Sequence, residues 1–537
     1  MTLLAVLPMA AAAQTAFDAY QISTSDMRGT ARFMSMGGAF TALGGDLSVL
    51  GQNPAGIGVY KNSEIGITML IDVQSAKAAT DLGTVKTDQT KVNVPNAGYI
   101  GSIYLSPVSP LRYFNWGISY GRVTSFNRAY RGVAGANTSL SNYTAGYTAA
   151  EEWTTNELSA YNSFYDPYRD GQAPWMSILL YNSYAINPST MKSTDYRGLY
   201  NGTPGEATFD VLEKGFIDEF NIDFGGNVLD MVYWGLGFNI NNVEYSNSTY
   251  YTERFSEACI ASPDAESRTV GTANWGLESW RRIYGNGFKF KLGVIVKPIN
   301  EFRIGFAFHT PTWYRLNYDG WAQTQYTYSY NTLGSKDLKG TYPTGSDYKT
   351  DDFFRFKLRS PWRIMVGAAG VIAQKAIVSL DYEYRTYGSM AVQDANGVEY
   401  QADRADIDSY YKGQHIVRAG AEFRLTQNFS LRAGYTYESS PVQNVAKDGD
   451  IMAFTSGPDN TQTQPSYIFD TSMRYITAGI GWHYGRFYID AAYVNKCRKT
   501  NWHAFTNYDD GVDWVRAPMA QITNNDNQIV LSAGFKF

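Results

Sequence analysis

The sequence of 537 residues contains little cysteine, histidine or charge, and no long hydrophobic run after its first residues. Its two cysteines, Cys259 and Cys497, are too few for a disulfide framework, although an exported chain could form a single bridge between them. A net charge of -5 gives no basic patch of the kind that binds nucleic acid. Because no later stretch reaches the roughly 18 to 20 apolar residues of a membrane helix, any crossing of a bilayer must use strands.

Residues suited to catalysis or metal binding are equally sparse. The four histidines, His309, His415, His483 and His503, lie far apart, and no two of them have the spacing of metal ligands. No Ser/His/Asp arrangement can be assembled for nucleophilic catalysis. We therefore expect no enzyme activity, no metal and no cofactor.

Aromatic residues and glycine, by contrast, are abundant, with 42 Tyr, 28 Phe, 12 Trp and 50 Gly. Short segments of alternating hydrophobicity recur from about residue 62 to the end of the chain, and no linker interrupts them. In the C-terminal segment, one face carries Ile529, Leu531, Ala533, Phe535 and Phe537, and the other carries Gln528, Val530, Ser532, Gly534 and Lys536. Strands with apolar residues outward and polar or small residues inward are typical of outer-membrane barrels.

Alternation and turn signals together predict an all-β fold, a transmembrane antiparallel β-barrel of 14 strands, and even numbers are usual for bacterial barrels. The predicted strands lie at 62–73, 95–105, 113–126, 216–228, 232–246, 283–297, 301–317, 352–370, 374–388, 411–425, 428–439, 472–484, 486–496 and 526–537. Short links alternate with long ones, of which the largest is 127–215. Since such barrels have short periplasmic turns and long extracellular loops, we expect the long links outside the cell.

The segment before the first predicted strand falls into two parts. Residues 1–13 are an apolar run that ends in small residues, which is typical of the back half of a signal peptide with a cut after Ala13. Residues 14–61 lack strand alternation and are rich in glycine. We expect them to form a compact plug inside the barrel formed by 62–537, because irregular backbone is tolerated there away from lipid. A disordered periplasmic tail is the alternative.

Part of this expected plug resembles a known family. The run MGGAFTALGGD at 36–46 is followed by GQNPAGI at 51–57, so that an Asn-Pro-Ala element stands shortly before the first predicted strand. This pattern resembles the hatch segment of the FadL/TodX family of outer-membrane transporters for hydrophobic compounds. The resemblance implies an N-terminal hatch at 14–61. The hatch residues that it implies are Gly38, Asn53, Pro54 and Ala55.

The long link at 127–215 contains a markedly apolar stretch, APWMSILLY at 173–181. In the resembled family, the corresponding large loop helps to form a hydrophobic groove that captures substrate. The ligand contacts that the resemblance implies are Trp175, Met176, Ile178, Leu179 and Leu180. The alternative is that this run fills the barrel mouth or packs against another protein.

Members of the resembled family release substrate sideways through a break at the third strand. Here this implies a lateral gate within 113–127, where Gly117 or Gly121 could mark a bulge. The implied function is passive uptake of hydrophobic small molecules, of the long-chain fatty acid or hydrocarbon class, through the bacterial outer membrane. The alternative is a membrane-embedded scaffold subunit of an outer-membrane secretion or assembly complex.

The expected partners follow from the same reading. They are a hydrophobic small-molecule ligand, membrane lipids and other outer-membrane proteins. A final strand that ends in an aromatic residue, here Phe537, resembles the signal that the barrel-assembly machinery recognises.

Overall fold

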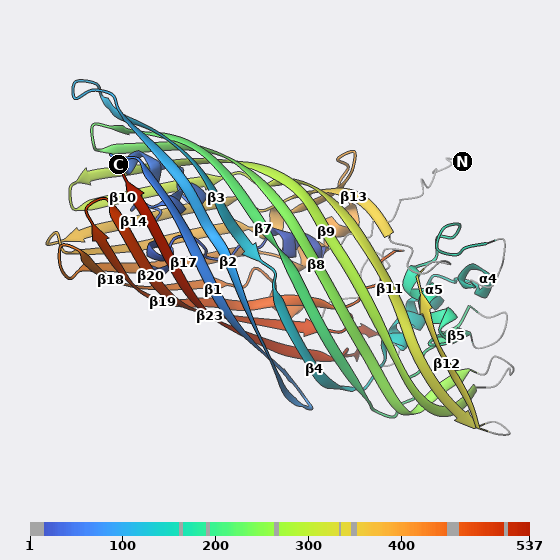
Figure 1. Cartoon of the computed structure of the whole chain (residues 1–537). Helices are drawn as coiled ribbons and strands as arrows, with labels where there is room; N and C mark the ends of the chain where they lie inside the picture. Colours follow the sequence, from blue (N-terminus) through green and yellow to red (C-terminus); the bar gives the residue numbers. More distant parts are fainter. Residues whose placement is uncertain are drawn as a thin grey trace, which may run out of the picture.

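The computed structural model describes residues 16–159, 165–188, 194–261, 268–331, 335–344, 352–447, 461–509 and 514–537. The predicted signal segment 1–13 lies outside these residues. The described chain forms a closed antiparallel β-barrel, drawn in Figure 1. Closure is complete because the first strand, β1 (Glu64–Thr80), pairs with the last, β23 (Met519–Lys536), from Glu64/Lys536 to Ala79/Gln521. The predicted fold of 14 strands is confirmed.

Several of the 14 wall strands are built from two consecutive elements separated by a short break. In chain order the wall consists of β1, β2 (Gly83–Tyr104), β3 (Leu111–Ser125) continued by β4 (Arg128–Ala136), β7 (Gly205–Val228), β8 (Val232–Ala261), β9 (Arg268–Ile299), β10 (Phe302–His309) continued by β11 (Trp313–Asn331), β13 (Asp352–Arg359) continued by β14 (Arg363–Ile372), β15 (Ala376–Thr386) continued by β16 (Ala391–Asp394), β17 (Gly413–Arg424), β18 (Phe429–Ser439), β19 (Tyr467–Tyr484), β20 (Phe487–His503) and β23.

Shorter elements lie inside the barrel or at the end that carries the long loops. The N-terminal segment contains α1 (Ala16–Ser23), α2 (Ala31–Ser35), η1 (Leu47–Gly51) and η2 (Pro54–Val59). The loops contain α3 (Leu140–Ala150), α4 (Thr155–Leu158), α5 (Trp175–Asn182), β5 (Asn187–Pro188), β6 (Tyr196–Arg197), β12 (Ser335–Pro343), η3 (Tyr387–Ser389), α6 (Gln401–Tyr410), α7 (Asn444–Lys447), β21 (Tyr508–Asp509) and β22 (Trp514–Val515). Within the described ranges, no helix is both long and apolar enough to cross a membrane.

The wall separates apolar from charged residues by simple alternation along each strand. On β9, the residues Phe288, Phe290, Leu292, Val294 and Val296 are between 38% and 49% exposed and face outward. Lys289 and Lys291, which lie between them, are buried and face the lumen. Because successive strand residues point to opposite sides, this is the pattern of a wall with lipid outside and polar groups inside.

The strands are much longer than a bilayer requires. β8 has 30 residues and β9 has 32, whereas about 9 to 11 residues span the hydrocarbon core. The outward residues of β8 are apolar from Val232 to Ile240 and polar from Asn242 onward. The link expected at 247–282 is therefore largely strand, as is the link expected at 74–94. The hydropathy pattern did not reveal these strand segments, because their outward residues lie beyond the lipid and are polar.

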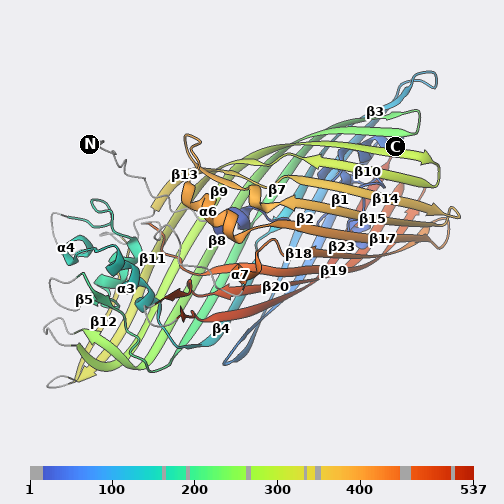
Figure 2. The same ribbon diagram turned by 180° about the vertical axis from the view of Figure 1, so that it is seen from behind.

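The end of the barrel that carries the long loops has its own hydrophobic core. Helices α3 and α5 of the long link pack against each other, and their residues share one hydrophobic cluster with inward-facing residues of β7 and β9, among them Phe209, Trp275 and Leu277. Figure 2 shows these loop helices gathered at one end of the barrel. Cys259 and Cys497 are both free, so the single bridge considered from the sequence is not formed.

Candidate functional site

The N-terminal segment lies in the lumen. Its helices α1 and α2 and the turns η1 and η2 appear inside the wall in both views (Figures 1 and 2), and most of its side chains from 16 to 60 are buried. The chain reverses at Gly37 and Gly38, whose φ angles of 61° and 68° lie in the left-handed region that favours glycine. The segment predicted as a hatch thus occupies the position of a plug, and its boundaries at 14 and 61 stay a prediction.

The Asn-Pro-Ala element organises the centre of this segment. The buried Asn53 side chain accepts a hydrogen bond from the backbone N–H of Ala55 (3.0 Å) and donates one to the carbonyl of Thr41 (2.6 Å). Pro54 begins η2, where its missing N–H costs nothing because the first N–H groups of a helix have no partner within it. Asn53 therefore caps one turn of the segment and fastens it to another.

The barrel wall carries glycine where this element touches it. A Cβ atom at Gly235 of β8 would collide with the backbone of Pro54, and one at Gly293 of β9 would collide with the side chain of Asn53. The backbone of the turn therefore approaches the wall more closely than any other residue at these two positions would allow.

Polar side chains of the wall hold the segment at further points. Asn115 of β3 donates to the carbonyls of Ile57 (2.7 Å) and Tyr60 (2.9 Å). The buried ring of His309 lies 2.7 Å from the carbonyl of Gln52. Buried carbonyl groups of the N-terminal segment are thus paired with side chains of the wall.

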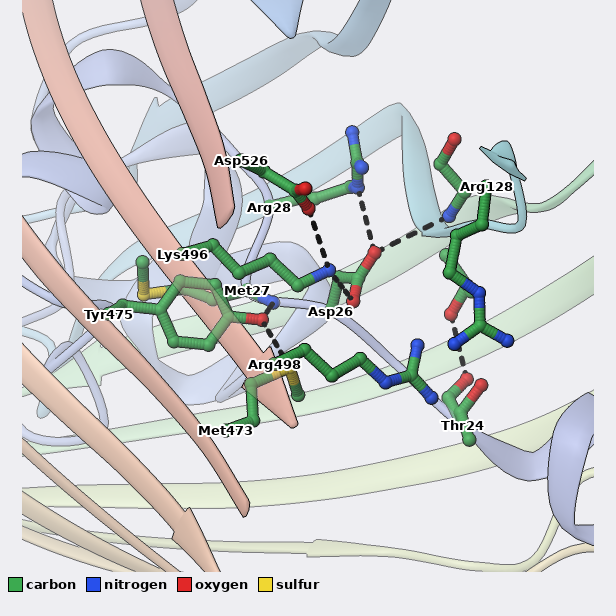
Figure 3. A network of polar contacts seen from close by, with 12 residues as sticks. Thr24, Asp26, Met27, Arg28, Arg128, Met473, Tyr475, Lys496, Arg498 and Asp526 are labelled. Atoms are coloured by element: carbon green, nitrogen blue, oxygen red, sulfur yellow. Dashed lines mark hydrogen bonds and ion pairs between the residues drawn. The ribbon is translucent and has the colours of Figure 1, made fainter. Parts of the chain in front are cut away.

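Residues Thr24–Arg28, which we call the strap, contact the third wall strand on one side and, as Figure 3 shows, Lys496 and Tyr475 on the other. The N–H of Asp26 donates to the carbonyl of Val123 (2.9 Å), and the hydroxyl of Thr124 donates to the carbonyl of Thr24 (2.8 Å). Val123 lies in an irregularity of β3, where the register with β7 shifts between Arg122 and Thr124. The strap therefore pairs with a backbone group that the neighbouring strand leaves free.

On the side away from β3, buried charges hold the strap. The carboxylate of Asp26 lies 2.7 Å from the ammonium of Lys496 on β20 and 3.4 Å from the guanidinium of Arg28. Lys496 also lies 3.8 Å from Asp526 on β23, and the N–H of Met27 donates to the hydroxyl of Tyr475 (3.3 Å). The strap thus joins β3 to the side of the wall formed by β19, β20 and β23.

The wall is interrupted beside the strap. The β2–β3 ladder runs from Tyr104/Tyr113 only as far as Asn96/Gly121. Beyond it, β2 stays paired with β1 as far as Gly83, while β4 pairs with β7, so no ladder joins residues 83–95 to residues 122–134 in the described chain. We call this interruption the wall break. Its far end is closed by the β1–β2 hairpin, because the N–H of Gly135 donates to Asp81 (3.0 Å).

The two glycines predicted as gate residues differ in position. Gly121 is the last paired residue of β3 and stands at the edge of the wall break. Gly117 lies inside the ladder, opposite Ile100, with the side chains of Ile57 and Leu50 close by. A gating role for either stays a prediction.

A cavity of about 90 Å³ lies between the strap and the wall break. It is lined by strap residues, by the edge residues Asn96, Gly121 and Val123, and by cationic side chains from the opposite wall. Three of these cations, Arg363, Arg385 and Arg418, converge on the fully buried Glu383 at 2.7, 2.7 and 2.5 Å. The lumen at this level is polar and rich in guanidinium groups.

The predicted ligand contacts of the long loop lie in α5. Trp175, Met176, Ile178, Leu179 and Leu180 are all buried in the hydrophobic core at the barrel mouth. Tyr168 packs edge-on against Trp175, with ring centroids 5.1 Å apart, and Tyr328 of β11 donates to the carbonyl of Ser183 just after α5 (3.2 Å). The run fills the barrel mouth, and contact with a ligand stays a prediction.

Sequence reasoning missed the strap, the irregularity at Val123 and the arginine cluster around Glu383. One signal was present, because Asp26 and Arg28 are charged residues in a segment expected to be enclosed, where charges need partners. In the part of the chain that the structure describes, no group of three or more His, Cys, Asp or Glu residues could hold a metal ion.

Comparison with known proteins agrees with this architecture. Residues 227–478 match the family described as outer membrane protein transport protein (OMPP1/FadL/TodX). The solved structure of a Pseudomonas aeruginosa FadL homologue covers 96% of this chain and 100% of its own, with a TM-score of 0.51 and 12% identity, a likeness of fold. An outer membrane protein of Neisseria meningitidis serogroup B is 21% identical over 293 residues, which are 52% of this chain and 58% of that relative.

The family match and the motif resemblance rest on different parts of the chain. The matched span lies in the barrel wall and its loops, whereas the Asn-Pro-Ala pattern lies in the N-terminal segment. The alignment with the Neisseria protein reaches only a little over half of that protein's length. The closed barrel, its lipid-facing band and the match over residues 227–478 together indicate that this protein is an outer-membrane β-barrel, similar to the OMPP1/FadL/TodX family.

Proposed function

We propose that the barrel is a passive channel that takes up hydrophobic small molecules, of the long-chain fatty acid or hydrocarbon class, and releases them sideways into the membrane. The observation that carries this proposal is the wall break between β2 and β3–β4, with a lumen cavity directly beside it. The description of the family as transport proteins supports the same class of function.

The proposed route begins at the barrel mouth and ends at the wall break. A ligand first displaces the apolar packing around α5, whose Trp175 and Leu179 offer hydrophobic contacts once exposed. It then passes the N-terminal segment and reaches the cavity beside the strap. Because the strap and the edge of the wall break line the same cavity, movement of the strap would connect the lumen with the outside of the wall.

The test uses the full chain in lipid nanodiscs and a labelled long-chain fatty acid or hydrocarbon. We expect saturable binding that weakens about tenfold on Trp175→Ala or Leu179→Ala, as is usual when a buried aromatic or aliphatic anchor is removed. Trp362→Ala is the matched control. Trp362 directly precedes β14, lies away from the mouth and is 37% exposed. If the wild-type chain shows no saturable binding, the uptake proposal is wrong.

A second function is favoured by one observation. The polar outer face of β8 beyond Ile240 offers protein surface well outside the lipid, as a scaffold subunit of a secretion or assembly complex would need. Gentle purification would separate the two functions. Stoichiometric protein partners with an empty lumen would favour the scaffold, and a lipid-like molecule in the lumen of an isolated barrel would favour uptake.

A further inference from the structure

An apolar groove runs along the outside of the wall just below the wall break. It encloses about 1110 Å³ and crosses seven neighbouring strands, from β19 through β20, β23, β1, β2 and β3 to β7. The side chains that form its floor are small, because Ala97 on β2 and Ala533 on β23 flank the outward Ile67 of β1. Aromatic residues form its two banks, with Trp482 and Phe487 on one side and Tyr120 and Phe220 on the other.

The inner side of the same wall explains why a groove forms on a surface that is otherwise convex. At Gly66, next to Ile67, an added Cβ atom would lie 2.7 Å from the side chain of Leu47 in η1 and 2.7 Å from the hydroxyl of Tyr488. The wall therefore lies unusually close to the N-terminal segment at this point. Gly66 permits this close approach on the inner face, and the small side chains of Ala97 and Ala533 leave the outer face shallow at the same level.

The groove and the wall break are adjacent. The uppermost pair in the groove is Ala97/Tyr120, and the next pair of the ladder, Asn96/Gly121, is the last before the break. Below it the outward residues Ile65, Ile67 and Ile118 are 49% to 56% exposed, so the groove lies in the hydrocarbon band. A molecule that leaves through the break meets this groove first.

We propose that the groove is a binding site outside the barrel for the hydrocarbon chain of the released ligand. This inference rests on the proposed function. The groove slightly exceeds the range of roughly 300 to 1,000 Å³ usual for small-molecule pockets, and its lining is almost wholly apolar. The polar groups at its upper rim already satisfy one another, since Arg122 donates to the hydroxyl of Tyr120 (3.2 Å) and pairs with Asp218 (2.8 Å). The site therefore recognises a chain by shape and apolar contact.

We expect the groove to prefer the chain of the released ligand over lipid chains only modestly. Lipid chains are as apolar as the groove, so transfer from bilayer to groove gains packing contacts and no hydrophobic driving force. The groove would act as a transient landing site, which guides the chain away from the wall break and slows its return to the lumen.

The test combines photolabelling with uptake, using the full chain in nanodiscs and in cells. The probe is a sixteen-carbon fatty acid that carries a diazirine near the end of its chain. We expect labelling of groove residues to exceed labelling of the opposite wall around Val366 on β14 by about threefold or more, because packing alone sets the preference. Ala97→Trp and Ala533→Trp fill the floor and should abolish this excess and slow uptake about threefold, with saturable lumen binding unchanged.

Val366→Trp is the matched control, since Val366 is 45% exposed on the outer face of β14 and should leave both readouts unchanged. Even labelling around the barrel would mean that ordinary lipid covers the groove, and cross-links between two chains there would mean that a second copy does. Either result overturns the landing site while lumen binding still supports uptake. Absence of lumen binding in the wild-type chain overturns the proposed function and the landing site together.

Discussion

The ammonium of Lys496 on β20 lies 2.7 Å from the carboxylate of Asp26, a residue that is 470 positions earlier in the chain. Both side chains are only 6% exposed. Because the backbone N–H of Asp26 also donates to Val123, one residue joins the charged side of the lumen to the edge of the wall break. The middle of the strap is thus held on two sides, by an ion pair to β20 and by a backbone hydrogen bond to β3.

Removal of this ion pair should free the strap. Lys496→Met leaves the buried Asp26 carboxylate with Arg28 as its remaining ion-pair partner, and breaking one partner of a buried pair costs about 3 to 5 kcal/mol. We expect faster hydrogen exchange at residues 24–28, measured by mass spectrometry on the barrel in nanodiscs. Lys499→Met is the matched control, because Lys499 is an exposed lysine on the same strand. Equal hydrogen exchange in the two variants would show that Lys496 does not hold the strap in place.

Substitution of a wall glycine should disturb the Asn-Pro-Ala turn. Gly235→Val places atoms where the backbone of Pro54 lies, and overpacking of this kind typically costs about 1 to 3 kcal/mol. We expect a lower unfolding temperature of the purified barrel and easier proteolysis of the N-terminal segment. Gly146→Ala in α3, where an added Cβ meets nothing within 4 Å, should leave both unchanged or slightly improved. Full resistance of the Gly235→Val barrel to proteolysis would show that the turn is not pressed against β8.

The loop helix α6 should respond to pH. Burial raises the pKa of Asp406 from 3.8 to about 6, and it also raises the pKa of the neighbouring Asp403. Since the folded state binds the proton of Asp406 more tightly than the unfolded state, this stabilisation is complete below about pH 4 and is lost as the pH rises through 6. Hydrogen exchange in 401–410 should therefore quicken, relative to its intrinsic rate, between pH 4 and 6.

Two variants separate this effect from other titrations. Asp406→Asn should weaken the pH dependence of α6 and leave only the part that comes from Asp403. Asp408→Asn should not, because the pKa of Asp408 is lowered by the hydrogen bond and charge of Arg404, the opposite direction. A profile that is the same in the wild type and in Asp406→Asn would rule out Asp406 as the responsible group.

The last residue should matter for assembly. Phe537 exchanges backbone hydrogen bonds with Ser63 (3.0 Å each way), and its ring stacks on Phe535 with centroids 5.9 Å apart. If the barrel-assembly machinery recognises the aromatic residue that follows β23, Phe537→Ser should reduce folded barrel in the membrane several-fold, whereas Phe537→Tyr should not. Heat-modifiable mobility of membrane fractions would measure the folded share. Equal amounts of both variants would argue against recognition through the terminal ring.

The wall was predictable from the sequence because alternation is a local property. Residues 528–537 show this well, since Ile529 and Leu531 are exposed outward while Val530 and Ser532 are buried inward, as the pattern predicts. The ends of the strands were less predictable. Residues 74–94 look like a loop because polar residues occur on both faces, yet β1 and β2 continue through them to a turn at 81–82.

The candidate site was predictable only in part. Asn53, Pro54 and Ala55 were found because their pattern resembles that of a family, and they lie at the centre of the enclosed segment. The partners of Asp26 could not be found in this way, because Lys496, Val123 and Asp526 are brought together by closure of the barrel and by a local shift in register. Such pairings depend on three-dimensional register, which single-sequence patterns do not encode.

The great length of β8 has a consequence for how molecules arrive. About 20 residues of this strand stand beyond Ile240, and at about 3.3 Å per residue and a tilt near 40° they lift the mouth roughly 50 Å above the hydrocarbon. Ionic fields in physiological salt decay over about 8 Å. The surface charge of the bilayer is therefore not felt at the mouth, and the composition of the leaflet beneath should not change the rate at which an anionic solute reaches it.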